Sequence, residues 1–206
     1  QDRRGPRLGS GGVGGVLVHV VVREVVGPDR GLLGAGLHLR AEGGVLAGHG
    51  ADAADADGAA AVLIATPAAA HGLRATTALA FRGASTQGVD PTRLGLGAAA
   101  AAARLLAEQG VAARQLAAVE FNEAFAGQVL ACTDLLGIDE RVLNADGGAL
   151  ALGHAYGASG AVSVVRLLAR ARDLPEGSLL LAMISSAGGI GTAALFEKTA
   201  VPGPTR

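Results

Sequence analysis

A glycine-rich stretch, Gly147–Gly160, places one histidine, His154, between glycines and directly ahead of a predicted helix. Two more short blocks accompany it: Asn122–Phe125 lies earlier in the chain and Ser185–Gly191 lies later. Each block stands at the end of a predicted strand. Because open α/β folds place their ligand sites at the carboxyl ends of their strands, the three blocks predict an α/β fold with one functional site at that edge of the sheet.

From about residue 45 onward, apolar runs that read as strands alternate with helical patterns. The five expected strands are Ala59–Ala65, Thr76–Gly83, Leu116–Phe121, Leu179–Ile184 and Thr192–Phe196. The four expected helices are Ala68–Gly72, Ala98–Gln109, Ala126–Leu136 and Ala158–Arg172. This alternation predicts an α/β domain in which layered helices pack on a mixed five-stranded sheet.

Local signals mark where several of these helices begin and end. Thr66 is a typical N-cap and Pro67 suits the first helical position. Gly110 and Gly137 directly follow two helical patterns and are expected to stop them. The last helix is amphipathic, and its expected outward face carries Arg166, Arg170 and Arg172.

Charge and cysteine content narrow the possible function classes. The net charge of -1 gives no electrostatic reason to expect nucleic acid or an anionic membrane as a partner. The single cysteine, Cys132, excludes an internal disulfide, fits the cytoplasm and is expected to be a small buried hydrophobe. The strongest apolar run, Val16–Val26, contains charged residues and is too short to span a bilayer. We therefore predict a cytoplasmic protein with no membrane span and no metal site.

The side chains of the first two blocks suit acid–base or oxyanion chemistry. A neutral imidazole at His154 can accept a proton, and its N–H can donate to a developing oxyanion. Asn122 can offer its amide to the same oxyanion or hold a water there. Glu123 can orient His154 or cap the helix that follows it. A histidine satisfied by backbone groups and an asparagine that fixes a turn are the alternatives, and we favour the functional reading.

Together the three blocks resemble those of the thiolases, the acyl-CoA acyltransferases, in the C-terminal half of that family. The family carries an Asn-Glu-Ala-Phe block, a GGA-x-A-x-GHP-x-GASG block and a terminal C-x-G-G-G-x-G block. They appear here in that order as Asn122–Phe125, Gly147–Gly160 and Ser185–Gly191. Asp57–Ala61 also resembles the DGAAA segment that opens the family's C-terminal domain.

The resemblance covers residues 45–199, which we expect to form a thiolase-like C-terminal domain. Residues 1–44 are expected to be an irregular glycine-rich extension, and residues 200–206 a tail. The aperiodic composition of the extension would fit translation in a shifted reading frame.

The resemblance also implies a role for each block. His154 would help activate the acyl-accepting cysteine and contribute to an oxyanion hole, which Asn122 would support through a water. Ser185 aligns with the cysteine that moves the substrate α-proton, and the N–H of Ala187 would belong to a second oxyanion hole. The substrate would be a coenzyme A thioester, with no covalently bound cofactor. The expected contacts with that thioester are Gly153, Ala155 and Gly188.

The chain departs from the family at the positions of its covalent chemistry. The acyl-accepting cysteine belongs to the family's N-terminal half, and Cys132 does not correspond to it. Ser185 replaces the base cysteine, and an alcohol is far harder to ionise than a thiol with a pKa of about 8.5. Ala155 replaces a proline, and Ala51–Ala54 stands where the family has Asn-Ala-Ser-Gly near the pantetheine. We therefore expect these 206 residues to be inactive alone.

Two function classes remain open. The first is a thiolase-like acyl-CoA acyltransferase subunit or remnant, for Claisen condensation or thiolysis of 3-ketoacyl-CoA. The second is a non-catalytic module that binds acyl-CoA or a partner. A serine hydrolase that uses Ser159 or Ser185 with His154 fails on pattern, because Gly157–Gly160 is not a G-x-S-x-G elbow. The expected partners are acyl-CoA and either an N-terminal thiolase half or a second copy of the chain.

Overall fold

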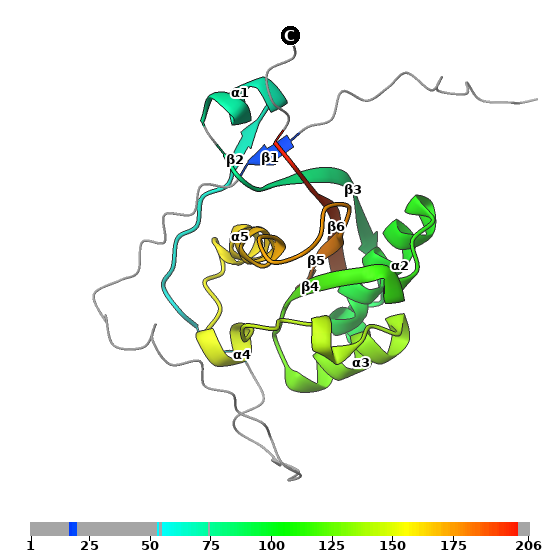
Figure 1. Ribbon diagram of the computed structural model, residues 1–206. Coiled ribbons are helices and arrows are strands. Elements are labelled where there is room, and N and C mark those ends of the chain that lie inside the picture. Colours follow the sequence, from blue (N-terminus) through cyan, green and yellow to red (C-terminus); the bar gives the residue numbers. More distant parts are fainter. Residues whose placement is uncertain (1–16, 20–52, 54, 74, 202–206) are drawn as a thin grey trace, which may run out of the picture.

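The computed structural model describes residues 17–19, 53, 55–73 and 75–201, whose elements alternate along the chain (Figure 1). The strands are β1 Leu17–His19, β2 Leu63–Ala65, β3 Ala78–Gly88, β4 Leu116–Asn122, β5 Leu179–Ser186 and β6 Ile190–Thr199. The α-helices are α1 Pro67–Gly72, α2 Gly97–Gln109, α3 Ala126–Leu136, α4 Ala149–Leu152 and α5 Ser159–Ala171. Short 3-10 turns are η1 Pro91–Leu96, η2 Ala113–Gln115 and η3 Glu140–Val142. None of the helices described has the length and apolar character that crossing a membrane demands.

The strands form one mixed sheet in the order β2-β1-β3-β6-β5-β4. Strands β4 and β5 run parallel, while the other neighbouring pairs are antiparallel. The expected α/β architecture is confirmed, and all five expected strands are present. The additional short strand β1 joins β2 to β3 and lies within the apolar run Val16–Val26, most of which falls outside the described residues.

The helix ends follow the local signals. The Thr66 hydroxyl accepts a hydrogen bond from the Ala69 N–H at 3.2 Å, and Pro67 begins α1. Gly110 and Gly137 end α2 and α3 in the left-handed conformation, each with a φ of 65°. The predicted bounds of α3 are confirmed, and those of α1, α2 and α5 differ by one residue.

Helices cover both faces of the sheet, which gives three layers (Figure 1). On one face, alanines of α2 and residues of α3 pack on Phe121, Leu181 and Leu195. On the other face, Leu167 and Leu168 of α5 pack on apolar side chains of β3, β5 and β6. The many alanines leave little side-chain volume between the layers, so helices and sheet approach closely. Cys132 is completely buried, as expected.

The sequence predicts a turn at Gly188–Gly191 between the last two strands, and the observed turn between β5 and β6 is shorter. It consists of Ala187, Gly188 and Gly189, because Ile190 and Gly191 already belong to β6. Gly188 and Gly189 have φ of 82° and 83°, values that favour glycine. The Gly189 carbonyl accepts from the N–H of Val89 at 2.7 Å, which bonds the turn to the residue that directly follows β3.

Candidate active site

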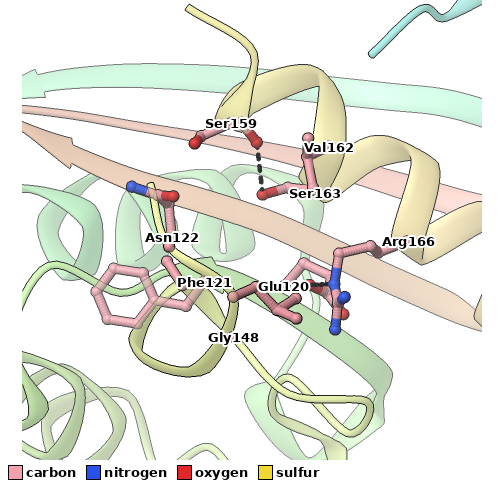
Figure 2. A pocket seen from close by; sticks show the side chains of 11 residues that line it. Glu120, Phe121, Asn122, Gly148, Ser159, Val162, Ser163 and Arg166 are labelled. Carbon is pink, nitrogen blue, oxygen red and sulfur yellow. Dashed lines mark hydrogen bonds and ion pairs between the residues drawn. The ribbon is translucent and has the colours of Figure 1, made fainter. Parts of the chain in front are cut away.

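A small cavity lies between the carboxyl end of β4, the loop around α4 and the first turns of α5 (Figure 2). Its volume is about 50 Å³. The residues that line it are Glu120, Phe121, Asn122, Gly148, Ala149, Leu152, Gly153, Ser159, Val162, Ser163 and Arg166. This volume admits a few waters or a small polar group. A drug-sized ligand needs a pocket of at least about 300 Å³, so only the reacting end of a large substrate would fit.

Asn122 is the last residue of β4 and faces this cavity. Its side chain is buried, with the residue 8% exposed, and no hydrogen bond joins its amide to another described residue. A buried amide without a partner costs on the order of 1–3 kcal/mol. Asn122 therefore offers a donor and an acceptor to whatever occupies the cavity.

His154 lies beside the cavity and is not itself one of the lining residues. Its neighbour Gly153 lines the cavity, and so does Ser159, whose Oγ lies 2.7 Å from His154 Nδ1. The imidazole also packs on Tyr156, with 4.3 Å between ring centroids. The structure thus brings Asn122 and His154 to one end of the sheet, connected through Gly153 and Ser159.

The segment before β2 holds the first two blocks together. The Ala53 N–H donates to the Ala124 carbonyl at 3.0 Å, and the Ala56 N–H donates to the His154 carbonyl at 3.2 Å. A Cβ added to Gly58 would lie 3.0 Å from Cβ of Ala155. This segment therefore crosses the Asn122–Phe125 block and the His154 loop, next to the positions where coenzyme contacts were expected.

Asn144 fastens the loop that leads to His154 onto the sheet. Its N–H donates to the Val119 carbonyl at 2.8 Å. Its side chain accepts from the Phe121 N–H at 2.8 Å and donates to the Phe121 carbonyl at 2.9 Å. The side chain therefore satisfies the backbone of β4, the edge strand, much as another strand would. Asn144 was missed because a single asparagine in a loop gives no sequence signal.

Glu123 orients this loop and does not contact the imidazole of His154. Its Oε1 accepts from the Asn144 amide at 2.7 Å, and its Oε2 accepts from the Leu150 N–H at 2.9 Å, in the first turn of α4. A Cβ on Gly148 would lie only 2.1 Å from the Glu123 carboxyl carbon, so this position requires glycine. The sequence suggested that Glu123 orients His154 or caps α3, the helix that follows it. Both alternatives are wrong, because the helix that Glu123 caps is α4.

A buried ion pair forms one wall of the cavity. Arg166 Nε donates to Glu120 Oε2 at 2.8 Å (Figure 2). Arg166 Nη2 donates to the Gly147 carbonyl. The two side chains are 19% and 9% exposed. Burial raises the pKa of Glu120 to about 7, while Arg166 acts in the opposite direction. The prediction that Arg166 faces outward is wrong, because a carboxylate buried on β4 needs a cation. The sequence signal that could have indicated the inward direction of Arg166 was Glu120, an acidic residue within an apolar strand.

Ser185 stands near the carboxyl end of β5, and β4 pairs with that strand so that Asn122 lies beside Ile184. Its Oγ donates to the Gly95 carbonyl at 2.9 Å and accepts from the Ala98 N–H at 2.9 Å. Ser185 is not among the residues that line the cavity, contrary to expectation. Its hydroxyl connects β5 to the turn before α2.

The other expected site residues lie in loops around this edge. Ala187 and Gly188 are exposed in the turn after β5, and Gly153 follows α4 with a φ of 88°. Their contacts with a substrate remain predictions. Among the described residues, no group of histidine, cysteine, aspartate or glutamate is arranged to hold a metal ion.

Residues 75–198 match the family model described as "Thiolase, C-terminal domain". The match spans more than half of the chain, and the chain belongs to the thiolase family. One similar relative is VraB of Staphylococcus haemolyticus, which carries the provisional name acetyl-CoA C-acetyltransferase. It is 42% identical over 142 residues, which are 69% of this chain and 36% of the relative.

Solved structures of thiolases share the fold. The peroxisomal 3-ketoacyl-CoA thiolase of Saccharomyces cerevisiae matches with a TM-score of 0.60 and 35% identity, over 67% of this chain and 39% of that chain. It is described as a five-layered structure constructed from two core domains of identical topology. Human mitochondrial 3-ketoacyl-CoA thiolase in complex with CoA gives 0.60 and 31%, over 70% and 38%. The chain thus spans between one third and two fifths of each of these relatives.

Proposed function

We propose that the chain is a subunit or remnant of a thiolase-like acyl-CoA acyltransferase, for thiolysis of 3-ketoacyl-CoA or the reverse Claisen condensation, and that residues 45–199 form its C-terminal half. The observation that carries the proposal is the buried amide of Asn122, which bonds to no other described residue and faces a cavity connected to His154 through Ser159. An oxyanion needs such a preorganised donor in a site that excludes bulk water. Membership of the thiolase family supports the choice of a CoA thioester as substrate.

In this proposal the residues of the site divide the chemistry between them. His154 accepts and returns a proton, and Asn122 stabilises the oxyanion directly or through a water. The Ala187 N–H serves a second oxyanion, while Gly153, Ala155 and Gly188 contact the thioester. The cavity holds only the reacting carbonyl, so the rest of coenzyme A lies over the surrounding loops. The buried single cysteine fits a reducing compartment, and we place the protein in the cytoplasm.

The acyl-accepting cysteine comes from an N-terminal thiolase half. Cys132 cannot serve, because it is completely buried and burial raises the pKa of its thiol, which keeps it from the reactive thiolate form. The outer side of α3 exposes Leu130 and Leu135, and Phe125 borders a groove beside residues 92–96. A second core domain would cover these apolar side chains.

A non-catalytic module that binds acyl-CoA or a partner is the second candidate. Ser185 favours it, because the hydroxyl at the base position is already bonded to two backbone groups. Such a module would bind the thioester and would leave it intact even with the N-terminal half present.

The chain alone should not cleave acetoacetyl-CoA in the presence of CoA, because covalent catalysis needs an accessible nucleophile. CoA-dependent cleavage that is abolished by His154→Ala would contradict this prediction and would reveal a nucleophile within this chain.

The chain should self-associate, or form a stable complex with a separately produced thiolase N-terminal half, because its apolar face is otherwise exposed to water. Light scattering measures the association. A monomer that is stable in dilute solution and does not bind the N-terminal half would contradict the proposed partner.

A further inference from the structure

The hydrogen bonds of Ser159 indicate which nitrogen of His154 carries a proton. Ser159 is the first residue of α5 and is 6% exposed. Its Oγ lies 2.7 Å from His154 Nδ1 and 3.0 Å from the carbonyl oxygen of Ala155. The hydroxyl has one proton to give, and the carbonyl has none.

Each of these two contacts needs its own proton. If the hydroxyl donated to His154, its oxygen would face the Ala155 carbonyl at 3.0 Å with no proton between the two atoms. The carbonyl cannot turn away, because it also accepts the N–H groups of Ala158 and Ser159, both at 2.8 Å. Helical serines commonly donate to the carbonyl four residues earlier in the chain. If the Ser159 hydroxyl donates to the Ala155 carbonyl in this way, the proton in the contact between Ser159 Oγ and His154 must come from Nδ1–H of His154.

We propose that Ser159 is a positioning residue that holds neutral His154 in the Nδ1–H tautomer, so that Nε2 carries the free lone pair. This inference rests on the proposed function for its significance. Ser159 takes the place that an aspartate occupies in a Ser-His-Asp triad, where the partner at Nδ1 sets the tautomer. Glu123 is engaged by Asn144 and Leu150, and Glu120, which lines the cavity, is engaged by Arg166.

The tautomer sets the order of the two roles that were open for His154. Neutral Nε2 cannot donate to an oxyanion, and it can accept the proton of a thiol while the bonding electron pair stays on sulfur as the thiolate. The imidazolium that results has N–H groups at both nitrogens and can then donate from Nε2. Ser159 accepts from Nδ1–H in both states, so the hydroxyl need not turn between them.

The test is ¹⁵N NMR of the full chain with labelled histidines, at a pH where the imidazole is neutral. His154 is assigned by comparison with His154→Gln. In the unmodified chain, the ¹⁵N chemical shift of Nδ1 should be that of a protonated imidazole nitrogen, and the shift of Nε2 that of an unprotonated one. Ser159→Ala should invert this pattern toward the Nε2–H form, and Ser159→Thr, which keeps the hydroxyl, should restore it. Ser163→Ala is the matched control, because Ser163 Oγ bonds the Ser159 carbonyl and not the imidazole.

An Nε2–H tautomer in the unmodified chain would overturn the proposal, whether or not Ser159→Ala folds. An unchanged tautomer in a folded Ser159→Ala variant would overturn it too. The measurement needs no substrate and no N-terminal half. A failure of the proposed function would therefore show as absent thiolysis with the expected tautomer intact, which distinguishes the two claims.

Discussion

Gly191→Ala is expected to lower the free energy of unfolding by more than about 4 kcal/mol, or to prevent folding. An added Cβ would lie 1.8 Å from the carbonyl carbon of Gly97, 1.9 Å from its oxygen and 2.4 Å from the nitrogen of Ala98. These are backbone atoms at the start of α2, which cannot rotate aside as a side chain can. Either α2 or β6 must move, and the hydrogen bond from the Ala98 N–H to Ser185 Oγ would be lost. Urea denaturation measures the effect.

Gly127→Ala is the matched control. Gly127 lies within α3, and a Cβ there would meet no atom within 4 Å. Because alanine suits a helix better than glycine, this variant should be unchanged or more stable by about 0.5–1 kcal/mol. Equal losses of stability in both variants would contradict the close approach of β6 to α2.

Arg166→Met is expected to cost about 3 kcal/mol of stability above neutral pH, because it leaves the Glu120 carboxylate buried without its cation. The surface pair of Arg104 and Glu108, both about half exposed, provides the control. Arg104→Met should cost less than about 1 kcal/mol, since exposed ion pairs contribute little. The additional change Glu120→Gln should recover part of the stability lost in Arg166→Met.

The loss in Arg166→Met should depend on pH in a defined direction. The pKa of Glu120 is raised from 4.5 to about 7 in the folded chain. The folded chain therefore holds a proton that the unfolded chain has released, and this contribution to stability is full below 4.5 and lost as pH rises through about 7. Without Arg166 the pKa rises further, so the deficit should be small at a pH of about 5.5 and large at about 8.5. Urea denaturation showing an equal deficit at both pH values would contradict the buried ion pair.

Helix positions could be predicted where the sequence carries its own local signal. The α3 pattern ends at Gly137, and the predicted bounds are those observed. The direction of Arg166 could not be predicted, since it depends on Glu120, a residue 46 positions away on another element. Amphipathicity places an arginine outward unless a buried charge attracts it inward.

The candidate site was predictable in part. Asn122 and Ser185 were placed at one sheet edge because each ends an apolar strand, and β4 and β5 do run parallel. The hydrogen bonds of Ser185 were not predictable, because they depend on the turn η1 and on how closely it approaches β5. The task of Glu123 was missed for a similar reason, since Leu150 and Asn144 approach it from distant parts of the chain.

The most direct test of the central claim is CoA-dependent cleavage of acetoacetyl-CoA by this chain assembled with a thiolase N-terminal half. The claim is that His154 and Asn122 perform thiolase chemistry once that half supplies the nucleophilic cysteine. We expect turnover in the assembled pair that neither part shows alone, and a loss of at least about 100-fold in His154→Gln. The account would be contradicted if the assembled pair cleaved acetoacetyl-CoA no faster than its separate parts, or if His154→Gln left the rate of the assembled pair unchanged.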